Sequence, residues 1–179
     1  MRGTAGIIAG LVLLGLTGCD EQKVTTGAPL AGGAMAVATL HTADGTEVGR
    51  ATATEVAGGL RFTIDTHGLP PGTHGAHVHT VGHCDPADFA TAGGHWNPTG
   101  MKHGSMNPQG PHEGDMPNLV IGTDGRGAIG VTIPGATMAG LLDADGSAIV
   151  IHANQDDLMT DPSGNSGARI ACGVLTPVR

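Results

Sequence analysis

The sequence of 179 residues is poor in aromatic side chains, with two Phe, one Trp and no Tyr. A hydrophobic core must therefore be built mainly from Val, Ile, Leu and Ala. Cations are also scarce: eight Lys and Arg stand against 16 Asp and Glu, and a net charge of -8 argues against nucleic acid as a partner. No Cys-x-x-Cys pair occurs, which argues against a thiolate zinc site and against thioredoxin-like chemistry.

A long apolar run is missing too, because the run at residues 7–16 falls short of the roughly 20 residues that a bilayer-spanning helix needs. Arg2 precedes this run and Leu-Thr-Gly-Cys follows it, so residues 1–18 are typical of a secretory signal peptide. Small residues before Cys19 resemble a lipoprotein signal, in which the cysteine is acylated and becomes the new N-terminus. The alternative is an ordinary signal peptide with a chance cysteine.

The segment after the signal peptide predicts a flexible link and a cellular location. Residues 19–33 are small and polar, which predicts a flexible link between a lipidated Cys19 and the folded domain. Asp20 resembles an inner-membrane retention signal of some Gram-negative bacteria. We therefore expect a lipid anchor and a location in the cell envelope, on the periplasmic face, with the inner membrane weakly favoured.

The cysteine count supports export. Of three cysteines, lipidation of Cys19 leaves Cys84 and Cys172 as an even pair. An oxidising compartment should join these two in a disulfide. In the chain-entropy model, closing a loop of nearly 90 residues stabilises the fold by roughly 4 to 5 kcal/mol.

The remainder of the chain, residues 34–179, predicts one all-β domain. Turn residues separate eight short runs rich in β-forming residues, and no convincing helical period appears. This pattern favours an antiparallel sandwich or barrel. The runs are residues 34–40, 46–56, 60–67, 75–80, 118–123, 127–134, 148–152 and 170–176. Two long stretches, 81–117 and 153–168, interrupt the rhythm and are expected to be functional loops held by something other than a sheet.

Histidine is unusually common, with ten residues against eight Lys and Arg, which points toward metal. His77 and His79 alternate on a predicted strand, so both imidazoles share a face. Taken alone, such a pair is more often a polar strand face than a site. His152 ends another predicted strand and is a candidate further imidazole for the pair, and imidazole ligands suit copper.

A second set of metal-type residues lies within one predicted loop. Residues 95–115 supply three imidazoles and a carboxylate, a tetrahedral set that suits zinc in a closed structural site. Metal binding would also fold a Gly- and Pro-rich loop that cannot fold itself. The alternative is a hydrophilic loop with scattered histidines. The residues of the set are His95, His103, His112 and Asp115.

These stretches together resemble the Cu,Zn superoxide dismutase family, in particular its bacterial periplasmic and lipoprotein members. The matching segments are GAHVHTVGHC, GGHWNP, KHGSMNPQGPHEGDMPNL, IVIHANQDD and GNSGARIACGVL, within residues 34–175. The resemblance implies a flattened eight-stranded antiparallel Greek-key β-barrel with two long functional loops. It further implies copper and zinc as cofactors, and dismutation of superoxide to oxygen and hydrogen peroxide.

The resemblance also implies a role for each residue of the site. Copper would be held by His77, His79, His95 and His152, and zinc by His95, His103, His112 and Asp115. His95 would bridge the two metals and take up a proton during turnover. Arg169 would bind the superoxide anion. Asp156 would hydrogen-bond one histidine of each metal, and Cys84 and Cys172 would form the family's disulfide.

Two competing hypotheses remain open. In the first, the chain is a non-catalytic envelope lipoprotein that binds copper and zinc on the same barrel. Such a protein should lose copper ligands or the substrate arginine first, whereas this chain keeps them. In the second, it is a structural envelope domain, which leaves the histidines unexplained. The oligomeric state is also open, and a homodimer is possible.

Several residues are expected to have no special role. We predict surface or turn positions for His41, His67, His74 and His83. We expect Trp96 to be a packing residue that buries the loop against the barrel. Packing in an irregular loop explains Met101, Met106 and Met116, and the alternative for these three is a part in copper delivery. Lys102 is the only cation between residues 80 and 117, and residues 153–168 contain none. We therefore expect weak electrostatic guidance of the substrate.

Overall fold

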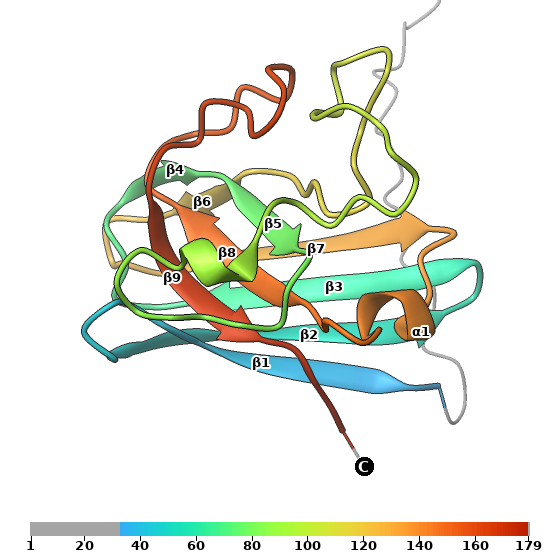
Figure 1. Cartoon of the computed structure of the whole chain (residues 1–179). Helices are drawn as coiled ribbons and strands as arrows, with labels where there is room; N and C mark the ends of the chain where they lie inside the picture. Colours follow the sequence, from blue (N-terminus) through green and yellow to red (C-terminus); the bar gives the residue numbers. More distant parts are fainter. Residues whose placement is uncertain (1–32, 179) are drawn as a thin grey trace, which may run out of the picture.

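The computed structural model describes residues 33–178, and there the regular secondary structure is almost entirely β-strand (Figure 1). The predictions for the signal peptide, Cys19 and most of the tether lie outside the described residues. The strands are β1 (Met35–His41), β2 (Glu47–Val56), β3 (Gly59–Thr66), β4 (Gly72–His74), β5 (Ala76–His79), β6 (Leu119–Ile121), β7 (Gly127–Pro134), β8 (Ala148–His152), β9 (Arg169–Val174) and β10 (Thr176–Pro177).

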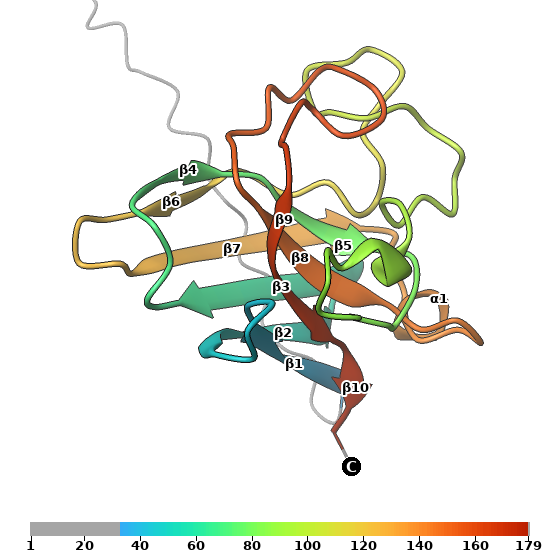
Figure 2. The same cartoon turned by 60° about the vertical axis from the view of Figure 1, so that its left-hand side comes forward.

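Every strand pairing is antiparallel, as predicted. The main sheet has the order β5-β8-β9-β1-β2-β3-β7, with β10 also paired to β1, while β4 and β6 pair separately. The neighbours β3–β7 and β9–β1 are far apart in sequence, which is the crossover pattern of a Greek key. Figures 1 and 2 show the sheet curling, so that β5, β8 and β9 lie over β1, β2 and β3. The predicted fold class is confirmed.

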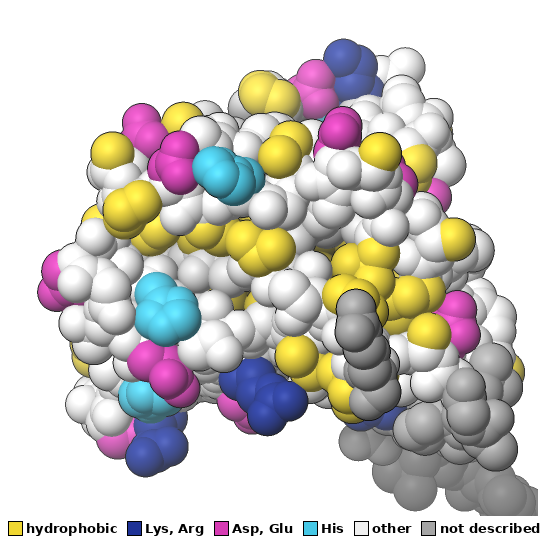
Figure 3. Space-filling model, turned by 60° about the horizontal axis from the view of Figure 1, so that its bottom comes forward, with side chains coloured by type: hydrophobic (Ala, Val, Ile, Leu, Met, Phe, Trp, Pro, Cys, Tyr) yellow, Lys and Arg dark blue, Asp and Glu magenta, His cyan; other side chains and the backbone are white. Residues whose placement is uncertain are grey.

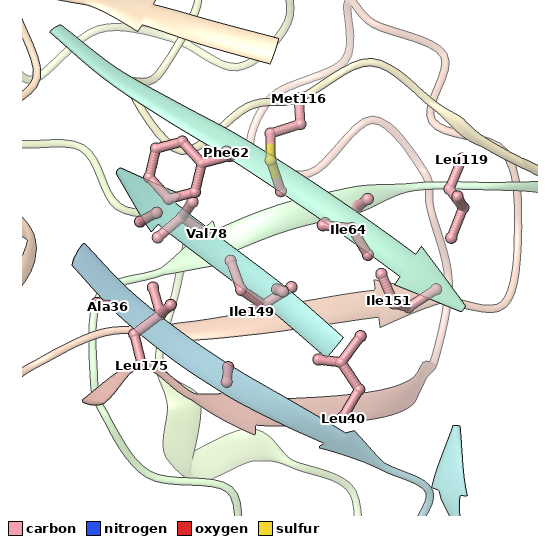
Figure 4. Close-up of a cluster of buried hydrophobic side chains, with 14 of the residues drawn as sticks. Ala36, Leu40, Phe62, Ile64, Val78, Met116, Leu119, Ile149, Ile151 and Leu175 are labelled. Carbon is pink, nitrogen blue, oxygen red and sulfur yellow. The ribbon is translucent and has the colours of Figure 1, made fainter. Parts of the chain in front are cut away.

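The core fills the space between these two layers (Figure 4). Alternate residues of β1 point inward, and β2 and β3 repeat this period over most of their length, as expected for strands with one solvated face. Leu40, Phe62, Ile64, Ile149 and Ile151 are each at most 1% exposed. Aliphatic side chains dominate, in line with the composition, and Trp96 joins the same cluster. The packing role predicted for Trp96 is therefore confirmed.

Helix is confined to two short pieces within the described residues: a 3-10 turn at Ala90–Ala92 and helix α1 at Met138–Leu141. Neither was predicted, because one helical turn is too short to display a hydrophobic period. Thr137 caps α1 by accepting a hydrogen bond from the Gly140 N–H at 3.1 Å. No helix in residues 33–178 is long and apolar enough to cross a bilayer.

Two long loops lie at the same end of the barrel (Figures 1 and 2). The first loop, residues 80–118, joins β5 to β6, and the second loop, residues 153–168, joins β8 to β9. The predicted disulfide is present: Cys84 of the first loop is bonded to Cys172 of β9, with Cα atoms 5.8 Å apart. The opposite side of the molecule shows scattered charges of both signs, and the described part of the face in Figure 3 carries no concentration of cations.

Candidate metal centre

Strand β5 presents its two histidines to the loops and its valine to the core. All of His77, Val78 and His79 are fully buried, and Val78 belongs to the main hydrophobic cluster. The alternation of a strand therefore sends both imidazoles to the opposite face, as predicted. Strand β8 runs beside β5, and the N–H of His152 donates to the carbonyl of Gly75 at 2.8 Å. Sheet pairing thus places a third imidazole next to the first two.

Four imidazoles converge in what we call the four-histidine group: His77, His79, His95 and His152. Each offers one ring nitrogen, and these nitrogens all lie within 4.8 Å of one another. The four atoms, His77 Nδ1, His79 Nε2, His95 Nε2 and His152 Nε2, are buried and have no hydrogen-bond partner. Burying an unpartnered polar atom is costly. A metal ion bound to the four nitrogens would remove that cost, so the residues fit a copper site.

The other ring nitrogen of each histidine is engaged, which fixes which atom faces the group. His79 Nδ1 lies 2.9 Å from the carbonyl oxygen of Gly93, and His152 Nδ1 lies 3.2 Å from that of Gly167. His77 Nε2 lies 2.7 Å from Asp156 Oδ2. The ring orientations are therefore set by the surrounding chain.

A second cluster, the histidine–aspartate group, consists of His95, His103, His112 and Asp115. The three Nδ1 atoms lie 2.8, 3.0 and 3.2 Å from Asp115 Oδ1, in the order of the chain. Asp115 Oδ2 accepts from the backbone N–H groups of Gly104 and His112 at 2.8 and 3.0 Å. Three imidazole nitrogens around one carboxylate oxygen form the set that a tetrahedral zinc ion takes.

His95 belongs to both groups. Its Nδ1 faces Asp115 and its Nε2 is the unpartnered atom of the four-histidine group. The His95 ring centroid lies 3.9 Å from that of His77 and 5.1 Å from that of His103. One imidazole can therefore contact two metal ions.

Asp156 joins the two groups from the second loop. Its Oδ2 contacts His77 Nε2 at 2.7 Å and its Oδ1 contacts His103 Nε2 at 2.9 Å. The Asn118 side chain holds the Asp156 backbone by two hydrogen bonds of 2.8 and 2.9 Å. Gly164, at φ +61°, passes so close that a Cβ there would collide with Asp156 Oδ1 and lie 2.6 Å from His103 Nε2. The backbone of Gly164 thus leaves the Asp156 carboxylate little room to move away from the His77 and His103 rings.

The pKa of His103 is shifted in the opposite direction from the pKa values of the four-histidine group. Burial lowers the pKa of His95 to about 4 and that of His152 to about 3, and burial also lowers the pKa of His77 and His79. Neutral imidazoles with free lone pairs are the form that binds metal. Burial would also lower the pKa of His103, but hydrogen bonds to Asp115 and Asp156 outweigh it and raise that pKa to about 9.

Arg169 stands at a cleft of about 380 Å³ beside the four-histidine group. His79, His95 and His152 line the same cleft. Arg169 Nη1 donates to the carbonyl of Phe89 at 2.5 Å and Nη2 to that of Gly93 at 2.7 Å. These two bonds fix a permanently charged side chain at the mouth of the histidine cluster.

The prediction for His74 is wrong. His74 lies in β4, is 4% exposed, and has its ring nitrogens 2.8 and 3.0 Å from the carbonyl oxygens of His152 and Pro70. It supports the backbone of a residue in the four-histidine group. No sequence signal could reveal this, since His152 is 78 positions further along.

The other residues expected to have no special role are either buried in the core or exposed at the surface. The packing expected of Met116 is confirmed, since it is 2% exposed in the main core. The same expectation is wrong for Met101 and Met106, which are 40% and 62% exposed. His41 and His67 are exposed, and the His83 side chain is 62% exposed. None of these three histidines belongs to either group.

Known proteins with similar sequences and structures identify the family. The model of the copper/zinc superoxide dismutase (SODC) family matches residues 47–175. Superoxide dismutase (Cu-Zn) 2 of Aquifex aeolicus is 38% identical over 181 residues, covering 98% of this chain and 99% of that protein. Superoxide dismutase (Cu-Zn) of Caulobacter vibrioides is 41% identical over 147 residues, 78% of this chain and 84% of that protein.

A solved structure agrees with these sequences. The crystal structure of a SOD-like protein from Bacillus subtilis, 40% identical, superposes with a TM-score of 0.74 and covers 78% of this chain and 97% of that one. Sequence and fold therefore lead to the same conclusion: the chain belongs to the copper/zinc superoxide dismutase family.

Proposed function

We propose that this chain is a copper- and zinc-dependent superoxide dismutase of the cell envelope. The observation that carries the activity is the set of four buried, unpartnered imidazole nitrogens, three of which belong to rings that line one cleft together with Arg169. The reaction converts two superoxide anions and two protons into oxygen and hydrogen peroxide. Family membership supports the same activity.

The geometry suggests which atoms hold each metal. Copper would be held by His77 Nδ1 and by Nε2 of His79, His95 and His152, the unpartnered atoms of the four-histidine group. Zinc would be held by Nδ1 of His95, His103 and His112 and by Asp115. When bound, copper supplies the one-electron redox couple that zinc lacks.

The side chains around the metals bind the substrate and move protons. Arg169 attracts the anion and orients it in the cleft with a fixed, charged donor fork. His95 Nε2 is the ring atom that can take up a proton and pass it on, while Nδ1 stays with the histidine–aspartate group. Asp156 keeps the His77 and His103 rings oriented during substrate binding and proton transfer.

The alternative is a non-catalytic metal-binding protein on the same barrel. It deserves a test because one similar solved structure is described as a SOD-like protein. Retention of all four imidazoles and of Arg169 favours the enzyme. A chain released from catalysis would have no reason to keep an arginine fixed by two carbonyls at the mouth of the cleft.

Reconstitution separates the two functions. The purified chain, loaded with copper and zinc and checked by metal analysis, should show dismutase activity that His95→Ala abolishes. His67→Ala is the matched control, because that histidine is exposed and belongs to neither group. Full metal content without activity in the unaltered chain would favour the binding protein.

The envelope location rests on the N-terminal sequence. The apolar run at residues 7–16 followed by Cys19 is typical of a lipoprotein signal, and the disulfide between Cys84 and Cys172 suits an oxidising compartment. We expect Cys19→Ser to abolish incorporation of labelled fatty acid and to release the protein from membranes. Equal incorporation in the Cys19→Ser variant would contradict the proposed anchor.

A further inference from the structure

Asp161 of the second loop contacts the first loop at the zinc ligands. Its Oδ1 accepts a hydrogen bond from the backbone N–H of His103 at 2.9 Å, and its Oδ2 accepts one from Lys102 Nζ at 2.9 Å. The same Oδ1 lies 3.9 Å from His112 Nε2. Asp161 belongs to neither metal group, and its side chain is 36% exposed. Its contacts therefore call for an explanation other than ligation.

His103 is the histidine that these contacts constrain. The second loop holds it at both ends, through Asp161 at the backbone N–H and through Asp156 at ring Nε2. The remaining ring nitrogen, Nδ1, faces Asp115. His103 lies in no strand or helix, so no sheet ladder fixes its position. The two carboxylates of the second loop take over that task.

The bond from Asp161 is part of a seam between the two loops. The N–H of Met106 donates to the carbonyl of Leu158 at 2.9 Å, and the Asn107 side-chain amide donates to the carbonyl of Met159 at 3.2 Å. Gly104 packs so closely on Leu158 that a Cβ would collide with the Leu158 carbonyl. The seam sets the distance between the loops, and Asp161 is the acidic side chain in it that reaches the backbone of His103.

We propose that Asp161 is a positioning residue for zinc, acting by holding the backbone of His103 where its ring can reach the metal. The inference rests on the proposed zinc site. It concerns zinc and not copper, because His77, His79 and His152 lie in strands β5 and β8, where sheet pairing holds them. Loss of Asp161 should therefore weaken zinc binding selectively.

The two bonds of Asp161 should contribute unequally. Lys102 and Asp161 are 55% and 36% exposed, and ion pairs of this kind usually contribute little. The bond to the N–H of His103 fixes a ligand directly, and groups that orient metal ligands typically change metal affinity by about 10- to 100-fold. Asparagine at this position keeps an oxygen acceptor for the His103 N–H but loses the charge.

The experiment compares four variants of the full chain: Asp161→Ala, Asp161→Asn, Lys102→Met and Asp157→Ala. Zinc affinity is measured by competition with a chromogenic chelator, and cobalt(II) in place of zinc reports tetrahedral geometry by its visible spectrum. We expect Asp161→Ala to lose zinc affinity about tenfold or more. Asp161→Asn should recover most of the loss, and Lys102→Met should cost no more than about threefold.

Asp157→Ala is the matched control. Asp157 carries the same charge in the same loop, but its bonds go to Met159, Thr160 and Asn165 within that loop. It should leave zinc affinity unchanged. Equal losses in Asp157→Ala and Asp161→Ala, no recovery with asparagine, or an equal loss of copper affinity would each overturn the inference. Failure of the proposed function looks different, since the unaltered chain would then bind no zinc or show no dismutase activity.

Discussion

Removing the disulfide should both destabilise the barrel and loosen Arg169. The bond closes a loop between Cys84 and Cys172, which are 88 positions apart. It also lies within a second hydrophobic cluster that contains Phe89, Ala92, Ala148 and Val150. The carbonyls of Phe89 and Gly93, in the segment that the disulfide ties down, hold Arg169. Replacing both cysteines with serine tests both effects without leaving a free thiol.

The size of the stability loss follows from the loop. The chain-entropy relation gives about 4.6 kcal/mol at 25 °C for a closed loop of 88 residues. A domain of this size shifts its melting temperature by roughly 2 to 4 °C per kcal/mol, so the expected fall is roughly 9 to 18 °C. This figure applies to the metal-free protein, because metal binding adds its own stabilisation.

The assay is thermal unfolding of the metal-free protein, followed by circular dichroism, for the unaltered chain and for the Cys84→Ser, Cys172→Ser double variant. The unaltered chain in reductant should melt close to the double variant. A fall of less than about 4 °C would refute the loop-closure reasoning. In the copper- and zinc-loaded proteins kcat/KM should also fall, and equal values at matched copper content would refute the link to Arg169.

Three further predictions concern the site. Arg169→Ala should lower kcat/KM several-fold at unchanged metal content, because the anion loses its charged donor; unchanged efficiency at matched copper would contradict this assignment. Burial lowers the pKa of His103, but hydrogen bonds to Asp115 and Asp156 outweigh this effect and raise it to about 9. The contact should therefore stabilise the metal-free protein most below about pH 6.5, and this stability should be lost as pH rises through 9. Zinc affinity should rise over the same pH range, since zinc displaces the proton on His103. Melting curves and zinc titrations at several pH values measure the stability and the affinity. Profiles that do not change with pH would count against the contact. Finally, Lys102 is already paired with Asp161 and the net charge is -8, so kcat/KM should fall only weakly with ionic strength in stopped-flow measurements, whereas a steep fall would reveal a guiding cation.

Much of this molecule is predictable from sequence because the patterns that matter are local, lying within one strand, one loop or one turn. Alternation along strands places His77 and His79 on one face, and the residue types between 95 and 115 suggest a zinc site before any coordinates are known. Turn residues separate the eight predicted runs and indicate the all-β class. The lipidation of Cys19 stays a prediction.

The remainder depends on contacts between distant parts of the chain. The prediction for His74 fails because its partner is a carbonyl on another strand, and no residue type reveals which carbonyl a histidine will meet. The bond between Asp161 and His103 spans 58 positions and joins two loops that lack sheet register. The family resemblance supplies the role of Asp156, but residue spacing alone does not.

Gly164 shows how a residue without functional groups can matter as much as a ligand. Any side chain at this position would push Asp156 away from His103, and Asp156 also holds His77. A screen for mutants that fail to retain metal should therefore return Gly164 beside the histidines. A survey restricted to histidine, cysteine and acidic residues would overlook it. The range of substitutions that this loop can accept is thus limited by the lack of room for a side chain as well as by chemistry.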